Sequence, residues 1–146
     1  MKNLFLALLL SAQLFAQSYY TLDNVRNLNL YFASDTEFLT PELKESMKKE
    51  ITNKLEKAGF VFGETDAYVF VVNIQAIGVE ESQAIDIQVK LGEEVITKRK
   101  DDIETFAYTY LEHRLIEGYD PYEDTLETVQ LLIDGFIAAH KDDNEE

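Results

Sequence analysis

Hydrophobic and polar residues alternate in several short segments of the chain, a pattern that predicts strands with one buried face. In residues 25–32, apolar positions alternate with the positions between them: Leu28, Leu30 and Phe32 against Asn27, Asn29 and Tyr31. Residues 60–62 predict a short second strand. Residues 67–77 are the most apolar segment after residue 16, and we expect that strand in the middle of a sheet.

The segment that follows predicts a meander of antiparallel strands. After a loop at residues 78–83, apolar residues alternate with Asp86, Gln88 and Lys90, which gives an amphipathic strand. Gly92 and Glu93 predict a turn into a further short strand at residues 94–98. Residues 103–115 fit a strand or a helix, and their aromatic and β-branched residues favour a strand.

Two other segments repeat apolar residues every three or four positions, which is typical of amphipathic helices. Thr40 and Pro41 mark the start of the first helix as N-cap and first helical residue, and Gly59 supplies the left-handed cap after its end. After a break at residues 118–121, a second helix of about five turns starts near Tyr122 and reaches His140.

Both helices must bury their apolar sides, so both are expected to pack on the sheet, most simply as a two-layer sandwich. The sequence therefore predicts an α+β fold with a mostly antiparallel sheet of five or six strands. The expected order is strand, helix, four strands, helix. Residues 17–141 form the single domain, and residues 142–146 form an acidic flexible tail.

The first sixteen residues predict a cleaved signal peptide. Lys2 precedes the apolar run at residues 4–10, and the small residue Ala16 precedes polar chain. The run is too short to span a bilayer core of about 30 Å. We expect the mature protein to begin near Gln17 in the periplasm, with release into the medium as the alternative.

Composition narrows the classes of partner. The chain has 28 acidic and 13 basic residues and a formal net charge of −15, which repels nucleic acid and anionic lipid surfaces. It has no cysteine, so disulfides, a thiol nucleophile and a lipid-bearing cysteine are excluded. We expect no nucleic acid partner and no membrane insertion once the leader is removed.

The residues that could support catalysis do not form a recognisable motif. We interpret His140 as lying near the end of the last helix, stabilised by its dipole and by solvent, and His113 as a surface residue. Neither histidine has the spacing of a metal site, and Asp86 falls on the wet face of its strand. No serine stands in a nucleophile elbow and no glycines form a phosphate loop. We expect no enzyme activity, no metal and no cofactor.

The tyrosines are the feature that suggests binding. There are eight tyrosines and no tryptophan, and tyrosine supplies rigid contact area with a polar tip. We predict a partner-binding patch made of Tyr108, Tyr110, Tyr119 and Tyr122. The alternative is that Tyr108 and Tyr110 cover one side of a strand, with their hydroxyl groups in water.

The order of elements also carries a resemblance. After the leader come LKESMKKEITNKLEKAGF at residues 43–60, DAYVFVVNI at residues 66–74 and LLIDGFI at residues 131–137. This arrangement resembles a group of small exported bacterial proteins of uncharacterised function. More distantly it is similar to α+β domains of envelope assembly factors, such as the amino-terminal domain of TolB and the curli-secretion lipoprotein family. The lipoprotein members have a cysteine after the leader, which this chain lacks. The resemblance implies an interaction module without catalytic residues.

We therefore expect a non-enzymatic periplasmic accessory or interaction module that binds a protein partner in the cell envelope through a sheet edge and residues 105–122. The first alternative is a carrier of a lipid or metabolite, with a pocket between sheet and helices lined by Phe70, Val72, Phe106 and Phe136. The second alternative is a hydrolase that uses His113 with a nearby acid.

Overall fold

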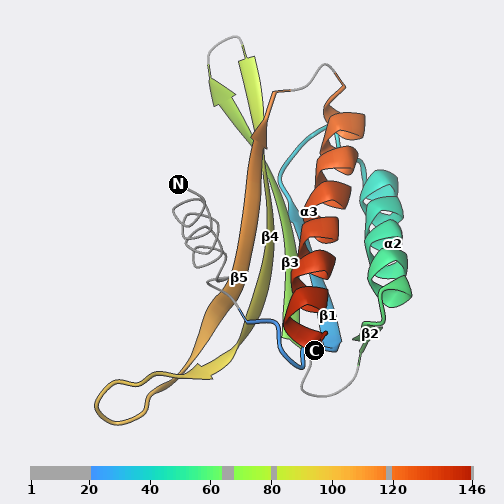
Figure 1. Ribbon diagram of the computed structural model, residues 1–146. Coiled ribbons are helices and arrows are strands. Elements are labelled where there is room, and N and C mark those ends of the chain that lie inside the picture. The colour runs from blue at the N-terminus through green and yellow to red at the C-terminus, as the bar shows by residue number, and fades with distance from the viewer. Residues whose placement is uncertain (1–20, 64–67, 80–81, 118–119, 146) are drawn as a thin grey trace, which may run out of the picture.

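The computed structural model describes residues 21–63, 68–79, 82–117 and 120–145, so the predicted leader lies outside the described residues. These residues form two layers, a sheet and a pair of helices that cover one of its faces (Figure 1). The predicted α+β class and order of elements are confirmed. The elements are β1 (Asn27–Ser34), α2 (Pro41–Lys57), β2 (Val61–Phe62), β3 (Tyr68–Val79), β4 (Ser82–Ile96), β5 (Glu104–Ile116) and α3 (Pro121–Asn144).

The sheet has five strands in the order β2-β1-β3-β4-β5 and is mixed. β1 runs parallel to both of its neighbours, β2 and β3. Between β1 and β2, α2 carries the chain back to the end of the sheet at which β1 began, so the two strands run in the same direction. β3, β4 and β5 are antiparallel neighbours with long registers, so most of the residue pairs in the sheet are antiparallel. β3 lies third in the order, in the central place that its apolar sequence predicts.

Both helices begin close to where the sequence predicts, and an N-cap side chain accepts a hydrogen bond from the first turn of each. The hydroxyl group of Thr40 accepts a hydrogen bond from the N–H of Leu43, and the carboxylate of Asp120 accepts one from the N–H of Glu123. A proline follows each cap as the first helical residue. Gly59 follows α2 with a φ of 100°, a conformation that glycine adopts without strain.

The core lies between the helices and one face of the sheet. Phe136 of α3 is fully buried at its centre. Its ring centroid lies 5.4 Å from that of Phe60, 4.9 Å from that of Phe70 and 5.1 Å from that of Tyr110. These three rings come from the segment before β2, from β3 and from β5, so one side chain of α3 contacts residues across the sheet.

β4 passes through Gly92 without turning. The prediction of a turn at Gly92 and Glu93 and of a separate strand at residues 94–98 is wrong, because β4 continues to Ile96. Gly92 lies instead under the ring of Phe106, and a Cβ atom at this position would overlap that ring. A glycine inside a strand often marks such a close approach, where an aromatic side chain of the next strand covers the bare backbone.

The last helix is longer than predicted, since it runs to Asn144. The prediction of a flexible tail from residue 142 is wrong for residues 142–144, because the last turn has partners at the start of the domain. The Asp143 carboxylate accepts a 2.6 Å hydrogen bond from the N–H of Leu22. The Asn144 side chain accepts one from the N–H of Asn24 and donates one to the carbonyl of Leu22.

His140 belongs to the same connection. Its Nε2 donates a 2.7 Å hydrogen bond to the carbonyl of Val25, and its ring centroid lies 4.6 Å from that of Phe60. The expectation that solvent surrounds this imidazole at the helix end is wrong, because α3 continues beyond it and the side chain is half-buried. None of the helices in the described part of the chain is long and apolar enough to cross a membrane.

Removing residues 142–146 should lower the free energy of unfolding by about 2 kcal/mol, because the hydrogen bonds to Leu22 and Asn24 are lost. Urea unfolding followed by circular dichroism measures the change. Asp142→Ala is the matched control, since Asp142 is exposed on the same turn. Equal stability of the truncated and complete chains would contradict the bonding of the last turn.

Candidate functional site

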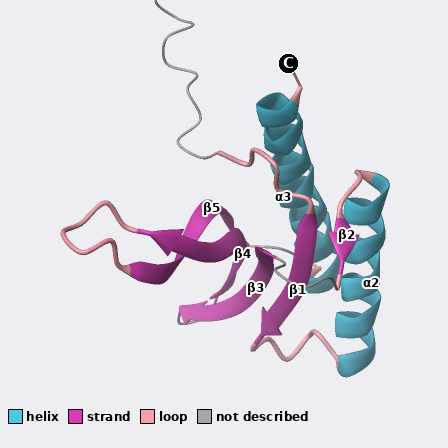
Figure 2. Cartoon of the chain, turned by 90° about the horizontal axis from the view of Figure 1, so that it is seen from below, coloured by secondary structure: helices cyan, strands magenta, loops and turns pink. Residues whose placement is uncertain are grey.

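The candidate site lies on the face of the sheet opposite α2 and α3, which we call the outer face. Both helices lie on the same side of the sheet, and the β4–β5 hairpin extends past them (Figure 1, Figure 2). Large hydrophobic side chains of β5 are exposed on this face. We define them as the outer patch: Phe106, Tyr108, Leu111 and Leu115, which are 51%, 54%, 42% and 62% exposed.

The register with β4 places Leu111 and Leu115 on the outer face. Leu111 is paired with Lys90, and Leu115 is paired with Asp86. Two of the three β4 residues between these positions, Ile87 and Val89, are fully buried on the helix side. Since side chains alternate between the two faces of a strand, Lys90 and Asp86 and the residues opposite them point outward.

A β-bulge decides where the two central tyrosines point. Tyr110 is paired with Leu91 but Tyr108 is paired with Gly92, so Thr109 is an extra residue in β5. Such an insertion changes which side chains share a face. Two tyrosines that simple alternation would place together are therefore divided between the two faces.

Contacts confirm this division. Tyr110 is 2% exposed and packs on Phe136, on the helix side. The ammonium group of Lys90 lies 5.0 Å above the ring of Tyr108 on the outer face, and the Phe106 ring meets Tyr108 edge-on at 5.7 Å. The prediction that Tyr110 shares an exposed patch with Tyr108 is therefore wrong, because the bulge turns Tyr110 into the core.

The other two predicted tyrosines do not join Tyr108. Tyr119 lies outside the described residues. Tyr122 is in the first turn of α3 and packs against the edge of the core, in the helix layer. Burial raises the pKa of its phenol, and the carboxylates of Glu50 and Glu123 raise it further. Of the three predicted tyrosines that the structure describes, Tyr108 alone belongs to the outer patch.

Sequence reasoning missed three members of the outer patch. Leu111 and Leu115 were not distinguished, because residues 103–115 also fit a helical pattern. Phe106 was expected in an internal pocket. The available signal was Gly92, because a lone glycine within an alternating strand is consistent with an aromatic cover on the neighbouring strand.

His113 and Asp86 lie on the outer face between the leucines of the patch. Nδ1 of His113 is 3.7 Å from a carboxylate oxygen of Asp86, and the Gln88 amide donates a hydrogen bond to the other oxygen. The Asp86 side chain is 15% exposed, so it is more buried than its predicted place on the solvent-exposed face of the strand implies. A carboxylate can orient an imidazole, but acyl transfer also needs a nucleophile beside it. The serine side chains that the structure describes belong to β1 and α2.

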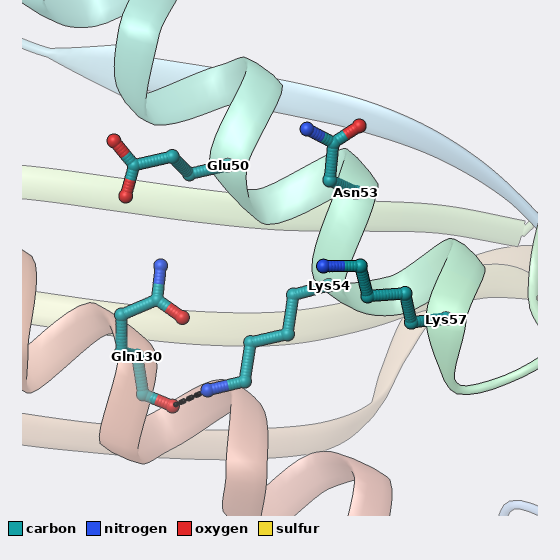
Figure 3. A pocket seen from close by; sticks show the side chains of 5 residues that line it. All are labelled: Glu50, Asn53, Lys54, Lys57 and Gln130. Carbon is teal, nitrogen blue, oxygen red and sulfur yellow. Dashed lines mark hydrogen bonds between the residues drawn. The ribbon is translucent and has the colours of Figure 1, made fainter.

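A second surface feature is a hollow of about 330 Å³ between α2 and α3 (Figure 3). Lys54 reaches across it from α2, where its ammonium group donates to the carbonyl of Gln130 at 3.1 Å and pairs with Asp134 at 2.8 Å. This side chain therefore ties the two helices together. The hollow is lined by polar side chains, unlike the apolar pocket of a lipid carrier: Glu50, Asn53, Lys54, Lys57 and Gln130.

The pocket predicted for a carrier does not form from its four residues. Phe70, Val72 and Phe136 are fully buried in the core, where the Phe70 and Phe136 rings are in contact. Phe106 lies on the opposite face of the sheet, over Gly92. Among the residues that the structure describes, no three histidine or acidic side chains come together in a way that could hold a metal ion.

Comparison with known proteins adds no assignment to these surfaces. No family model and no curated protein matches the chain.

Replacement of the two tyrosines should have unequal effects on stability. Tyr110→Ala should lower the free energy of unfolding by about 3–5 kcal/mol, because it opens a cavity beside Phe136. Tyr108→Ala should cost less than about 1.5 kcal/mol, since it removes only exposed contacts with Lys90 and Phe106. Urea unfolding of both variants measures the difference. Similar losses would contradict the division that the bulge produces.

Proposed function

We propose that the protein is a non-enzymatic accessory module of the bacterial cell envelope, and that it binds a protein partner through the outer patch. The observation that carries this proposal is the exposure of four large hydrophobic side chains on one strand, on a face that no described helix covers. Large hydrophobic side chains that gather exposed on one face of a protein are typical of interaction sites.

The aromatic part of the patch is already ordered for binding. The Phe106 ring rests on the bare backbone of Gly92, and Tyr108 is held between Phe106 and the ammonium group of Lys90. Side chains that are held in place before binding lose less conformational entropy when a partner arrives. Phe106 and Tyr108 therefore have the properties of binding anchors.

Charge restricts the kind of partner. The chain carries a formal net charge of −15, so a partner with an acidic surface would be repelled at long range. Lys90 borders the patch on the outer face and interrupts this acidity locally. A partner that offers apolar side chains surrounded by neutral or basic groups fits this surface best.

The envelope location is supported by the leader-like first sixteen residues and by the resemblance to envelope assembly domains. The absence of cysteine is compatible with an oxidising compartment, where a free thiol would be at risk. The same absence removes the usual lipid anchor, so we propose that the mature protein is not tethered to a membrane.

Partner capture from an envelope extract tests the patch. Phe106→Ala and Tyr108→Ala should each reduce the amount of the main captured protein by about tenfold or more, because each removes an aromatic anchor. Gly92→Ala should also reduce capture, since the added methyl group displaces the Phe106 ring without changing its chemistry. Quantitative mass spectrometry of the captured material is the readout.

Leu131→Ala is the matched control, because Leu131 is an apolar residue of α3 with a similar exposure of 54%. It should leave capture unchanged. If all three patch variants retain the partner as well as this control does, the outer patch is not the binding surface.

Export has its own test. The chain expressed with its own leader in a Gram-negative host should be recovered from the periplasm with Gln17 as its first residue, because the segment before it has the three parts of a cleavable signal peptide. Peptide mass spectrometry of the fractionated cells identifies the terminus. Recovery of the intact chain from the cytosol would refute the proposed location.

A further inference from the structure

We infer that the outer face of the sheet binds a neutral, extended glycan chain through the ring of Tyr31 and a group of polar side chains on β3, β4 and β5. We call this group the polar cluster: Asn73, Gln75, Asp86, Gln88 and His113. None of these residues belongs to the outer patch, so the inference goes beyond the proposed function and does not depend on it.

The register of the sheet brings the polar cluster together. Asn73 is paired with Gln88 and Gln88 is paired with His113, so these side chains form a row across three strands. In the next row, Gln75 is paired with Asp86. The β3 and β4 residues that separate the two rows are fully buried on the helix side. Because side chains alternate between the faces of a strand, the cluster lies on the outer face.

The carboxylate of Asp86 orders the cluster. The Gln88 amide donates a 2.5 Å hydrogen bond to one of its oxygens, and Nδ1 of His113 lies 3.7 Å from the other. The bond uses one N–H of Gln88, which leaves the second N–H and the amide oxygen for a ligand. Side chains that are held in place before binding lose less conformational entropy.

The chemistry of the cluster matches sugar hydroxyl groups. An amide and a neutral imidazole each offer both a donor and an acceptor, and a hydroxyl group does the same. An apolar surface placed over these side chains would leave their polar atoms without partners, which costs free energy. This part of the outer face therefore suits a ligand rich in hydroxyl groups better than the apolar partner proposed for the outer patch.

Tyr31 supplies an aromatic ring on the same face. Its neighbours Leu30 and Phe32 pack against the core, so Tyr31 points outward, where it is 60% exposed. It is paired with Val71, which precedes Asn73 by two positions on the same face of β3. A tyrosine ring has an apolar face and a polar tip. Sugar rings carry C–H groups on their faces and hydroxyl groups at their rims, so one ligand can stack on Tyr31 and bond to the cluster.

The shape of the site favours a chain over a small molecule. Small ligands bind in concave sites, whereas the cluster lies on a sheet face that no described helix covers (Figure 1). Tyr31 on β1 and His113 on β5 are three strand spacings apart, or about 14 Å. A ligand that contacts both ends of the site is therefore longer than one sugar ring.

The distribution of charge favours a neutral chain. The protein carries a formal net charge of −15, so an anionic glycan would be repelled at long range. Within the cluster Asp86 alone has a formal charge at neutral pH with histidine neutral, and its side chain is only 15% exposed. A neutral glycan avoids this repulsion and still finds hydrogen-bonding groups.

Titration with soluble oligosaccharides tests the inference. In isothermal titration calorimetry the purified complete chain should bind cellohexaose or chitohexaose, which are neutral and extended. Tyr31→Ala and Gln88→Ala should each weaken this binding by about fivefold or more, because one removes the stacked ring and the other removes a hydrogen-bonding amide. Raising the salt concentration from about 0.1 M to about 1 M should leave the affinity nearly unchanged, since the ligand is uncharged.

Ile96→Ala is the matched control, because Ile96 is an apolar residue near the other end of β4 with an exposure of 65%. It should bind as the wild type does, and circular dichroism checks that every variant is folded. Polygalacturonate, an anionic glycan, should not bind. A wild-type protein that binds neither neutral chain, or that prefers polygalacturonate, would overturn the inference, as would full binding by both cluster-side variants. A protein that captures its envelope partner yet binds neither neutral chain would overturn this inference alone.

Discussion

The packing of Phe136 against three other aromatic rings is the interaction on which the two-layer structure depends. Phe60, Phe70 and Tyr110 belong to elements that are distant in the sequence, and a single buried ring of α3 contacts all of them. Because α3 and α2 bury their apolar stripes on the same face, no described helix remains for the other face of the sheet. The exposed outer face is thus a consequence of how the core is built.

The bulge in β5 then gives the two halves of that strand different properties. On the hairpin side, Phe106 and Tyr108 form an aromatic surface over Gly92 that is ordered by ring contacts. On the other side, the strand is regular up to Ile116, with Leu111 and Leu115 on the outer face and Glu112 and Arg114 on the helix side.

Much of the fold was predictable because its signals are local. Thr40, Asp120 and the prolines that follow them satisfy the first turns of their helices with neighbouring atoms, and strand alternation needs only a few consecutive residues. Gly92 was misread because a glycine between two strand-like segments is as typical of a turn as of a covered position in a continuous strand. The choice depends on Phe106, which is distant in the sequence. The last turn of α3 was misread for the same reason, since the partners of Asp143 and Asn144 lie at the opposite end of the domain.

The sequence by itself determined the class of fold, the order of its elements, the strongly acidic character of the chain and the lack of any cysteine chemistry. These properties follow from composition and from interactions between residues a few positions apart. Only the tertiary structure decided which tyrosines reach the surface, because one extra residue in β5 places Tyr108 and Tyr110 on opposite faces, where simple alternation along the strand would place them together. It also decided that both helices share one face, because that depends on the joint packing of segments from the whole chain. The outer patch was thereby left exposed.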